Sequence, residues 1–231
     1  MVDFSKRSNQ SEMMDDFSLS PNIIYPIMDE LEVINKLLGG HRVFFDAFNG
    51  MNLQDGMSIS DWGCGGGDSL REIATWAEKK DLDLELIGID ATESAIAYAR
   101  QKALRYPEIE FFCTDVMSTA MKPNSFDIVI SSLFTHHFED QNWVALIKKM
   151  VDCSRYAVII NDLHRYPAAY YSIGILTKLF SKSPLVKHDS KLSVLRGFKK
   201  GELIRLLKEA GVSKYRIKWM WAFRWQVVIY K

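Results

Sequence analysis

The feature that most constrains this fold is the alternation of apolar strand patterns and amphipathic helix patterns between residues 57 and 161. Runs such as DIVIS at 127–131 and YAVIIN at 156–161 are almost continuously apolar, which is typical of strands covered on both faces. Helical patterns separate these strands, so the strands are expected to run parallel. The expected strands are 57–62, 84–90, 109–115, 126–132 and 156–161, and the expected helices are 69–80, 93–104 and 142–153.

The end of the chain departs from this alternation. Residues 198–210 show the period of an amphipathic helix, which Gly211 ends. Two strand patterns, 215–221 and 223–230, then follow with almost no connection, so they can pair only as an antiparallel hairpin. We therefore predict an α/β fold with a doubly wound, mostly parallel sheet of seven strands and a C-terminal antiparallel hairpin.

A chain of 231 residues suits one sizeable domain with small additions. The polar and acidic residues 1–20 predict a mobile N-terminal tail. Residues 21–54 predict a helical cap, with Pro26 in the first turn of its first helix. Residues 55–231 form the main domain, and an insertion at about 163–197 is expected to cover the substrate as a lid.

Charge and composition limit the partners. Lysine and arginine total 29, as do aspartate and glutamate, so the net charge of zero argues against wholesale capture of nucleic acid. The C-terminal quarter from residue 178 is basic, and it is interpreted either as solvated faces or as a patch for an anionic partner. No apolar run approaches the roughly 20 residues of a membrane span, and the N-terminus lacks the layout of a signal peptide, so a cytoplasmic location is expected.

The three cysteines, Cys64, Cys113 and Cys153, are odd in number and widely spaced. Neither a disulfide framework nor a metal site is expected from this pattern, and we interpret them as free thiols.

A glycine-rich turn, ISDWGCGGGDSL at 59–70, joins the first strand to its helix. Glycines there allow positive φ and let the backbone pass close to a ligand. In a doubly wound sheet, ligands bind at the carboxyl ends of the strands, where this turn lies. Asp90 ends the second strand, and an acid at that place can accept hydrogen bonds from ribose hydroxyls. The turn therefore predicts a nucleoside site.

Two acids decide which nucleoside is favoured. Asp68 stands where a dinucleotide fingerprint requires a small residue, and Asp61 adds a negative charge at the strand end. These charges would repel a pyrophosphate and attract an ammonium or a sulfonium. The phosphate-binding pattern GK[ST] is also missing from the turn.

Taken together, four features resemble the class I S-adenosylmethionine-dependent methyltransferases over roughly residues 55–231. They are DWGCGGG at 61–67, Asp90, Thr114-Asp115 and the run FDIVISSL at 126–133. The resemblance implies S-adenosylmethionine as the cofactor and a Rossmann-like methyltransferase fold. The segments LLGGHR, FTHHF and DLHR resemble the small-molecule branch, in secondary-metabolite or quinone-type pathways.

The resemblance also implies roles for single residues. Asp61 and the turn backbone would hold the methionine part, helped by the main chain near Ser131. Asp90 would hold the ribose and Asp115 the adenine. Arg42 is a candidate partner of the methionine carboxylate, with a surface salt bridge as the alternative. The candidate cofactor residues are Arg42, Asp61, Gly63, Cys64, Gly65, Asp90, Ala91, Thr92, Asp115, Val116 and Ser131.

Histidines follow the fourth and fifth strands at the same sheet edge. LFTHHFED supplies His136 and His137, and NDLHR supplies Asp162 and His164. Because histidine has a pKa of about 6.5 and a phenol about 10, an imidazole can accept the phenol proton as methyl transfer proceeds. His136 oriented by Asp162 is the first choice of general base, and the other three side chains are the remaining catalytic candidates.

The expected acceptor is a small molecule, aromatic or polyketide-like, methylated on oxygen or carbon. Aromatic residues in the cap and in the insertion favour an apolar pocket. The sequence SSLF at 131–134 replaces the Asn/Asp-Pro-Pro-aromatic turn of enzymes that methylate DNA amines, and no nucleic-acid partner is expected. The alternatives are a quinone-pathway methyltransferase, a non-catalytic nucleotide-binding module and a nicotinamide oxidoreductase. The oligomeric state is left open.

Overall fold

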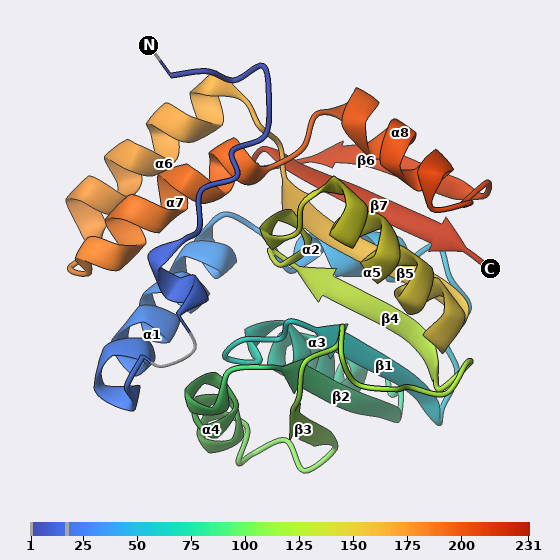
Figure 1. Cartoon of the computed structure of the whole chain (residues 1–231). Helices are drawn as coiled ribbons and strands as arrows, with labels where there is room; N and C mark the ends of the chain where they lie inside the picture. Colours follow the sequence, from blue (N-terminus) through green and yellow to red (C-terminus); the bar gives the residue numbers. More distant parts are fainter. Residues whose placement is uncertain (1, 17–18) are drawn as a thin grey trace.

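The computed structural model describes residues 2–16 and 19–231. Its centre is a seven-stranded sheet of order β3-β2-β1-β4-β5-β7-β6 (Figure 1). The strands are β1 (Met57–Trp62), β2 (Leu84–Asp90), β3 (Ile109–Cys113), β4 (Phe126–Ser132), β5 (Ser154–Leu163), β6 (Tyr215–Met220) and β7 (Arg224–Tyr230).

The first five strands are parallel, and the last two form the antiparallel hairpin beside β5. The predicted doubly wound fold with its C-terminal hairpin is therefore confirmed. Because β1 lies between β2 and β4, the chain order reverses at β1, and the carboxyl ends of these three strands surround one crevice.

Helices cover both faces of the sheet and bury two apolar clusters. On one face pack α2 (Arg42–Phe48), α3 (Asp68–Glu78) and α4 (Glu93–Lys102), through side chains such as Phe44 and Ile73. On the other face pack α5 (Asp140–Cys153) and α8 (Lys200–Glu209), through Trp143, Leu206 and others. The alternation of strand and helix thus places the crevice at one rim of a rigid sheet.

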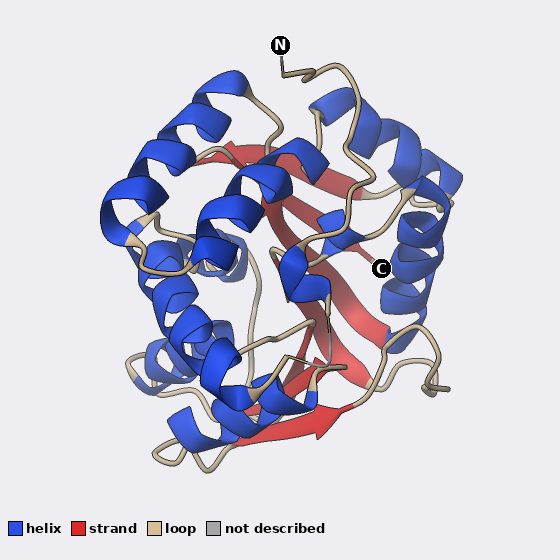
Figure 2. Ribbon diagram, turned by 60° about the vertical axis from the view of Figure 1, so that its left-hand side comes forward, coloured by secondary structure: helices blue, strands red, loops and turns tan. Residues whose placement is uncertain are grey.

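The remaining elements lie beyond the carboxyl rim of the sheet. They are the short helix η1 (Met13–Asp15), the long helix α1 (Pro21–Leu37), the turn η2 (Thr135–His137) and a pair of packed helices, α6 (Pro167–Phe180) and α7 (Pro184–Arg196). Figure 2 shows the N-terminal segment crossing in front of the strands. The predicted insertion at about 163–197 is therefore largely a helical pair.

The N-terminus differs from the prediction of a mobile tail over residues 1–20. Arg7 donates hydrogen bonds to the carbonyls of His136 and Phe138 at 2.9 Å, and Glu12 is buried. The polar residues of this segment pair with polar groups of the domain. The prediction searched for a periodic spacing of apolar residues, which cannot detect such contacts. Residues 1, 17 and 18 of that predicted tail lie outside the described residues.

The cap helix also begins earlier than predicted. Pro21 occupies the first turn of α1, and Pro26 lies inside the helix. Pro21 fits the helix start, because a residue in the first turn has no partner for its N–H. The prediction of Pro26 in the first turn is wrong: Pro26 lies in the second turn, where it cannot donate to the carbonyl four residues before it. None of the helices in residues 2–16 and 19–231 is long and apolar enough to cross a membrane.

Candidate active site

A cavity of about 490 Å³ lies at the carboxyl ends of β1, β2, β4 and β5. It has two parts. The glycine-turn half is lined by Asp61, Gly63, Cys64, Gly65, Gly66, Asp68, Asp90, Thr92 and Arg224. The histidine half is lined by Glu12, Met14, Asp15, Phe134, His136, His137, Phe138, Leu163, Val186, Asp189, Ser190 and Ser193.

Two glycines of the turn are required by contact as well as by conformation. Gly63 has a φ of +72°, and a Cβ there would lie 2.2 Å from the ring of Phe134. Gly67 has a φ of +71° where α3 begins, and a Cβ there would lie 2.7 Å from Phe111. A larger residue at either position would displace an aromatic ring, so the sequence GCGGG is what allows the turn to fold so tightly.

Asp90 holds the turn in place from β2. Its Oδ2 accepts a hydrogen bond from the backbone N–H of Gly65 at 2.9 Å, and its Oδ1 accepts one from Thr92 at 2.8 Å. Each carboxylate oxygen can accept a further hydrogen bond. Asp90 therefore both organises the turn and presents acceptor capacity to the cavity.

Asp61 is a buried carboxylate at the end of β1. Its Oδ1 has no hydrogen-bond partner among the described residues. Burial and the nearby charges of Asp68 and Asp90 raise the pKa of Asp61 well above its usual range. A buried, unpaired carboxylate that lines a cavity is a site for a cation, because a cation would restore its charged form.

Asp68 is held by the cap. The Nε2 of His41 lies 2.8 Å from its Oδ2, and the side-chain amide of Asn35 donates to the same oxygen at 2.8 Å. Burial opposes ionisation, but the hydrogen bond and charge of His41 lower the pKa of Asp68. The cap thus fixes the first turn of α3 as a negative wall of the cavity.

Arg224, the first residue of β7, brings a positive charge to this negative half. Its guanidinium is buried, and its Nε has no hydrogen-bond partner among the described residues. Burial lowers its pKa to about 10, which leaves it charged at neutral pH. Two unpartnered polar atoms, the Nε of Arg224 and the Oδ1 of Asp61, therefore lie in the same half of the cavity.

In the histidine half, His136 and Asp162 form a tight pair. The Nδ1 of His136 lies 2.7 Å from the Oδ1 of Asp162, and the other oxygen of Asp162 accepts from the hydroxyl of Thr135 at 2.7 Å. Burial opposes its charge, but His136 lowers the pKa of Asp162 to about 2. The carboxylate therefore fixes the ring orientation of His136 and leaves its Nε2 directed elsewhere.

The Nε2 of His136 faces Glu12 of the N-terminal segment. The two atoms, Nε2 and Oε1, are 3.5 Å apart and make an ion pair, and neither has a hydrogen-bond partner in the described part of the chain. Burial opposes the charge of the imidazole, but Asp162 and Glu12 together raise the pKa of His136 to about 9. With Glu12 in place, His136 is protonated at neutral pH.

His137 makes a parallel contact with the same segment. Its Nδ1 lies 2.7 Å from the Oδ1 of Asp15, and Arg196 of α7 pairs with the other oxygen of Asp15 at 2.9 Å. The ligand atoms of Glu12, His136 and His137 all lie within 4.8 Å of one another. The ion pairs of Glu12 and Asp15 with the two histidines hold this cluster together.

The predicted site residues fall into two groups. Eight line the cavity: Asp61, Gly63, Cys64, Gly65, Asp90, Thr92, His136 and His137. The others lie around it or away from it: Arg42, Ala91, Asp115, Val116, Ser131, Asp162 and His164.

Several members of the second group have other contacts. Arg42 is exposed, and the buried arginine in the cavity wall is Arg224. The hydroxyl of Ser131 donates to the carbonyl of Trp62 at 2.9 Å, which joins β4 to β1. Asp115 is exposed and accepts from the N–H of Met117 at 2.8 Å, and Val116 packs in a core cluster. The adenine roles of these last two residues stay predictions.

His164 does not join the histidine pair. Its ring stacks on Tyr166 at 5.3 Å and packs against Trp225 at 4.8 Å, and burial lowers its pKa. Asp162 contacts His136 and does not line the cavity itself.

Five residues line the cavity that the sequence did not predict as site residues: Glu12, Asp15, Asp68, Asp189 and Arg224. Only Asp68 carried a local signal, since it stands directly after the glycine turn. The others reach the site from distant segments, and nothing in their own sequence neighbourhood marks them.

Comparison with known proteins shows what this fold and this glycine turn are similar to. Residues 59–156 match the family model of a methyltransferase domain. This match covers less than half of the chain. Among relatives of this methyltransferase domain, phosphoethanolamine N-methyltransferase 1 of Arabidopsis thaliana is 31% identical over 106 residues, which are 45% of this chain and 20% of that protein. The match thus spans about a fifth of that relative's length.

Solved structures with the same fold include other methyltransferases. A SAM-dependent methyltransferase from Aquifex aeolicus is 16% identical, with a TM-score of 0.63, over 92% of this chain and 99% of that chain. The plantazolicin methyltransferase, in complex with SAH, is 18% identical, with a TM-score of 0.65, over 89% of this chain and 87% of that chain. At these identities the likeness concerns the methyltransferase fold.

The glycine-turn half fits S-adenosylmethionine, the cofactor of class I methyltransferases. The amino-acid end of this cofactor carries an ammonium and a carboxylate, and the cavity offers the unpaired Asp61 and the unpaired Arg224 Nε for them. Asp90 retains acceptor capacity for ribose hydroxyls. The glycine-turn half therefore has groups of the right charge for both the ammonium and the carboxylate of the methionine part.

Proposed function

We propose that the protein transfers a methyl group from S-adenosylmethionine to an oxygen or carbon of a small, aromatic or polyketide-like acceptor, with His136 as the general base. The observation that carries the proposal is the 2.7 Å hydrogen bond between His136 Nδ1 and Asp162, beside the glycine-turn half of one cavity. When bound, the cofactor supplies an electrophilic methyl group on its sulfonium.

Apolar side chains form one part of the lining of the histidine half, where the acceptor would bind. Met14, Phe134, Phe138, Leu163 and Val186 line it. Such a wall fits a ring or a polyketide-like body better than a sugar. The quinone-pathway alternative falls within the same class of acceptor and stays open.

Charge argues against a phosphorylated acceptor of the kind that the Arabidopsis relative is named for. The acidic side chains Glu12, Asp15 and Asp189 line the histidine half. The nearby guanidinium of Arg196 is already paired with Asp15, at 2.9 Å. A phosphate would meet repulsion in the histidine half, whose described lining residues include no arginine.

The proposed step requires Glu12 to leave His136. An acceptor hydroxyl at the Nε2 of His136 would take the place of the Glu12 carboxylate, now 3.5 Å away. Loss of that negative charge lowers the pKa of His136, its Nε2 proton leaves with the Glu12 carboxylate, and the neutral Nε2 then accepts the hydroxyl proton. Asp162 then stabilises the imidazolium, and the methyl group is transferred in line to the acceptor oxygen.

A methyl-transfer assay with purified protein tests the proposal. Labelled S-adenosylmethionine would be offered with a panel of phenols, polyketide-like pyrones, quinols and phosphoethanolamine. Labelled product from a phenol or pyrone, lost in His136→Ala, is the expected result. Product from phosphoethanolamine alone would contradict the proposed acceptor class. Tight cofactor binding without any product from the panel would favour a non-catalytic binding module.

A further inference from the structure

The outer face of α6 is apolar although it faces solvent. Tyr171, Ile175 and Leu179 follow one another at helical spacing and are 57%, 62% and 69% exposed, and Phe180 at the helix end is 75% exposed. The inner face of the same helix carries polar Thr177, which is buried against α7. A helix that exposes a row of large apolar side chains presents a surface that its own domain does not cover.

Exposed aromatic rings extend this face toward the β6–β7 hairpin. Tyr166, just before α6, stacks on Phe223 at 6.0 Å, and Phe223 packs against Trp221 at 6.2 Å and Trp219 at 6.1 Å. Trp221 is 65% exposed. We call the surface of Tyr166, Tyr171, Ile175, Leu179, Phe180 and Trp221 the α6 face. Trp and Tyr are the residues that favour the boundary between water and lipid.

Positive charge accompanies the α6 face. Residues 166–200 contain six lysines and Arg196, against Asp189 as the single acidic residue, although the whole chain is neutral. Asp189 is buried and binds the backbone N–H groups of Met13 and Met14 at 3.0 Å and 2.9 Å, so it does not offset the exposed lysines. Lys178 lies on α6 itself, and Lys182 lies two residues after it; both are exposed.

We propose that the α6 face docks the protein on the surface of an anionic lipid bilayer. Apolar and aromatic side chains would enter the headgroup region, and the lysines would pair with anionic headgroups, as in other interfacial helices. A soluble acidic protein would match the charge, but it would not account for the row of exposed Ile, Leu, Phe and Trp.

The α6 face lies close to the histidine half of the cavity, where the acceptor would bind. α6 packs on α7, and α7 contributes Val186, Ser190 and Ser193 to the histidine half of the cavity. Docking would therefore bring the acceptor side of the cavity next to the bilayer, where a lipid-like acceptor is dissolved. The docking itself does not depend on the proposed reaction, because it can be measured without cofactor or acceptor.

Vesicle binding tests this proposal directly. The full chain would be sedimented with vesicles of phosphatidylcholine alone and with vesicles of equal parts phosphatidylcholine and phosphatidylglycerol. We expect binding to the anionic vesicles, weakened by salt, and little binding to the neutral ones.

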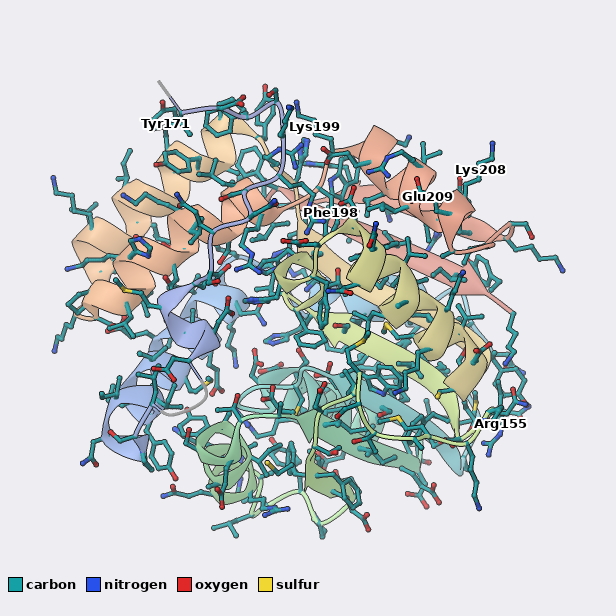
Figure 3. The ribbon with its side chains drawn as sticks, in the orientation of Figure 1. Arg155, Tyr171, Phe198, Lys199, Lys208 and Glu209 are labelled. Atoms are coloured by element: carbon teal, nitrogen blue, oxygen red, sulfur yellow. The ribbon has the colours of Figure 1, made fainter. Side chains whose placement is uncertain are left out.

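Two paired variants separate the apolar and charged contributions. Ile175→Ser with Leu179→Ser, and Lys178→Glu with Lys182→Glu, should each weaken vesicle binding at least about tenfold. Leu104→Ser and Lys208→Glu are matched controls that should bind as the wild type does. Leu104 is 82% exposed just after α4, and Figure 3 shows Lys208 on α8, on the opposite side of the molecule from Tyr171.

Three outcomes would overturn the proposal. The first is absence of binding to the anionic vesicles, and the second is equal binding by the paired variants and the wild type. The third is a dimer in sedimentation velocity that the Ile175→Ser/Leu179→Ser variant abolishes, because a second copy would then cover this face. Retained cofactor binding by every variant would show that each one still folds.

Discussion

The two halves of the cavity are built in different ways. The glycine-turn half is formed mostly by one continuous stretch of chain, residues 61–69, with Asp90 from the next strand. The histidine half combines the N-terminal segment, the turn after β4, the end of β5 and α7, which are widely separated in sequence. One half depends on backbone conformation, and the other depends on side-chain ion pairs between separate segments.

This difference predicts different behaviour in the two halves. The glycine turn is fixed by its own hydrogen bonds and by contacts such as that of Gly63 with Phe134, so it is ready to bind before any ligand arrives. The ion pairs of Glu12 and Asp15 with the histidines must break for an acceptor to reach His136. Cofactor binding should therefore be separable from catalysis by substitution.

The largest effect is expected for His136→Ala. Loss of the base should slow turnover on the order of 10²-fold or more, because positioned proton transfer contributes that much. His164→Ala is the matched control, since His164 follows the adjacent strand but stacks on Tyr166 outside the cavity. Steady-state kinetics with the best acceptor would make the comparison. Full activity in His136→Ala would remove this residue from the mechanism.

A smaller effect is expected for Asp61→Asn, on cofactor affinity. Loss of the charged acceptor for the ammonium should weaken binding about tenfold or more, since such a hydrogen bond is worth about 1.5–3 kcal/mol. The fold should not suffer, because the substitution removes repulsion from Asp68 and Asp90. Calorimetric titration measures the affinity and a melting curve measures the stability, with Asp83→Asn, at an exposed acid just before β2, as the control. Unchanged affinity would separate Asp61 from the cofactor.

Glu12→Gln should move the pH profile more than it changes the maximal rate. Without the carboxylate, the pKa of His136 falls from about 9 toward 6.5, so the acid limb of the profile shifts to lower pH. The rate near neutral pH should increase. Glu139 is an exposed acid just after η2, the turn that carries His136, and Glu139→Gln should leave the pH profile unchanged. An unshifted limb in Glu12→Gln would show that Glu12 does not control this histidine.

The smallest expected effect concerns stability. The folded-state pKa of His136, about 9, lies above its unfolded value of about 6.5. Its contribution is therefore fully present below pH 6.5 and is lost as the pH rises through about 9. Urea unfolding across this range should show a decrease in the free energy of unfolding that His136→Gln reduces. The same decrease in both proteins would place its source in another group.

The sequence could predict the parts of the molecule that repeat a local pattern. The strands β1, β2 and β4 have the predicted bounds, because each is a short apolar run ended by turn residues. Asp61, Asp90 and His136 were predictable for a similar reason, since each ends or follows a strand at the ligand-binding rim.

The remaining site residues depend on tertiary contacts. Glu12 stands in a polar segment with no apolar period, and only the packing of that segment on η2 and α7 makes it part of the cavity. Arg224 begins an otherwise apolar strand, while Arg42 stands in a sequence neighbourhood that resembles known enzymes. The local sequence pattern therefore favoured the exposed Arg42, and not the buried Arg224, as the partner of the methionine carboxylate.

Titration of S-adenosylhomocysteine into the wild type, Asp90→Ala and His136→Ala tests the separation of the two halves most directly. Asp90 holds the glycine turn, and His136 belongs to the other half. We predict that Asp90→Ala weakens binding about tenfold or more and that His136→Ala binds as the wild type does. Equal loss of affinity in both variants, or none in Asp90→Ala, would contradict the account.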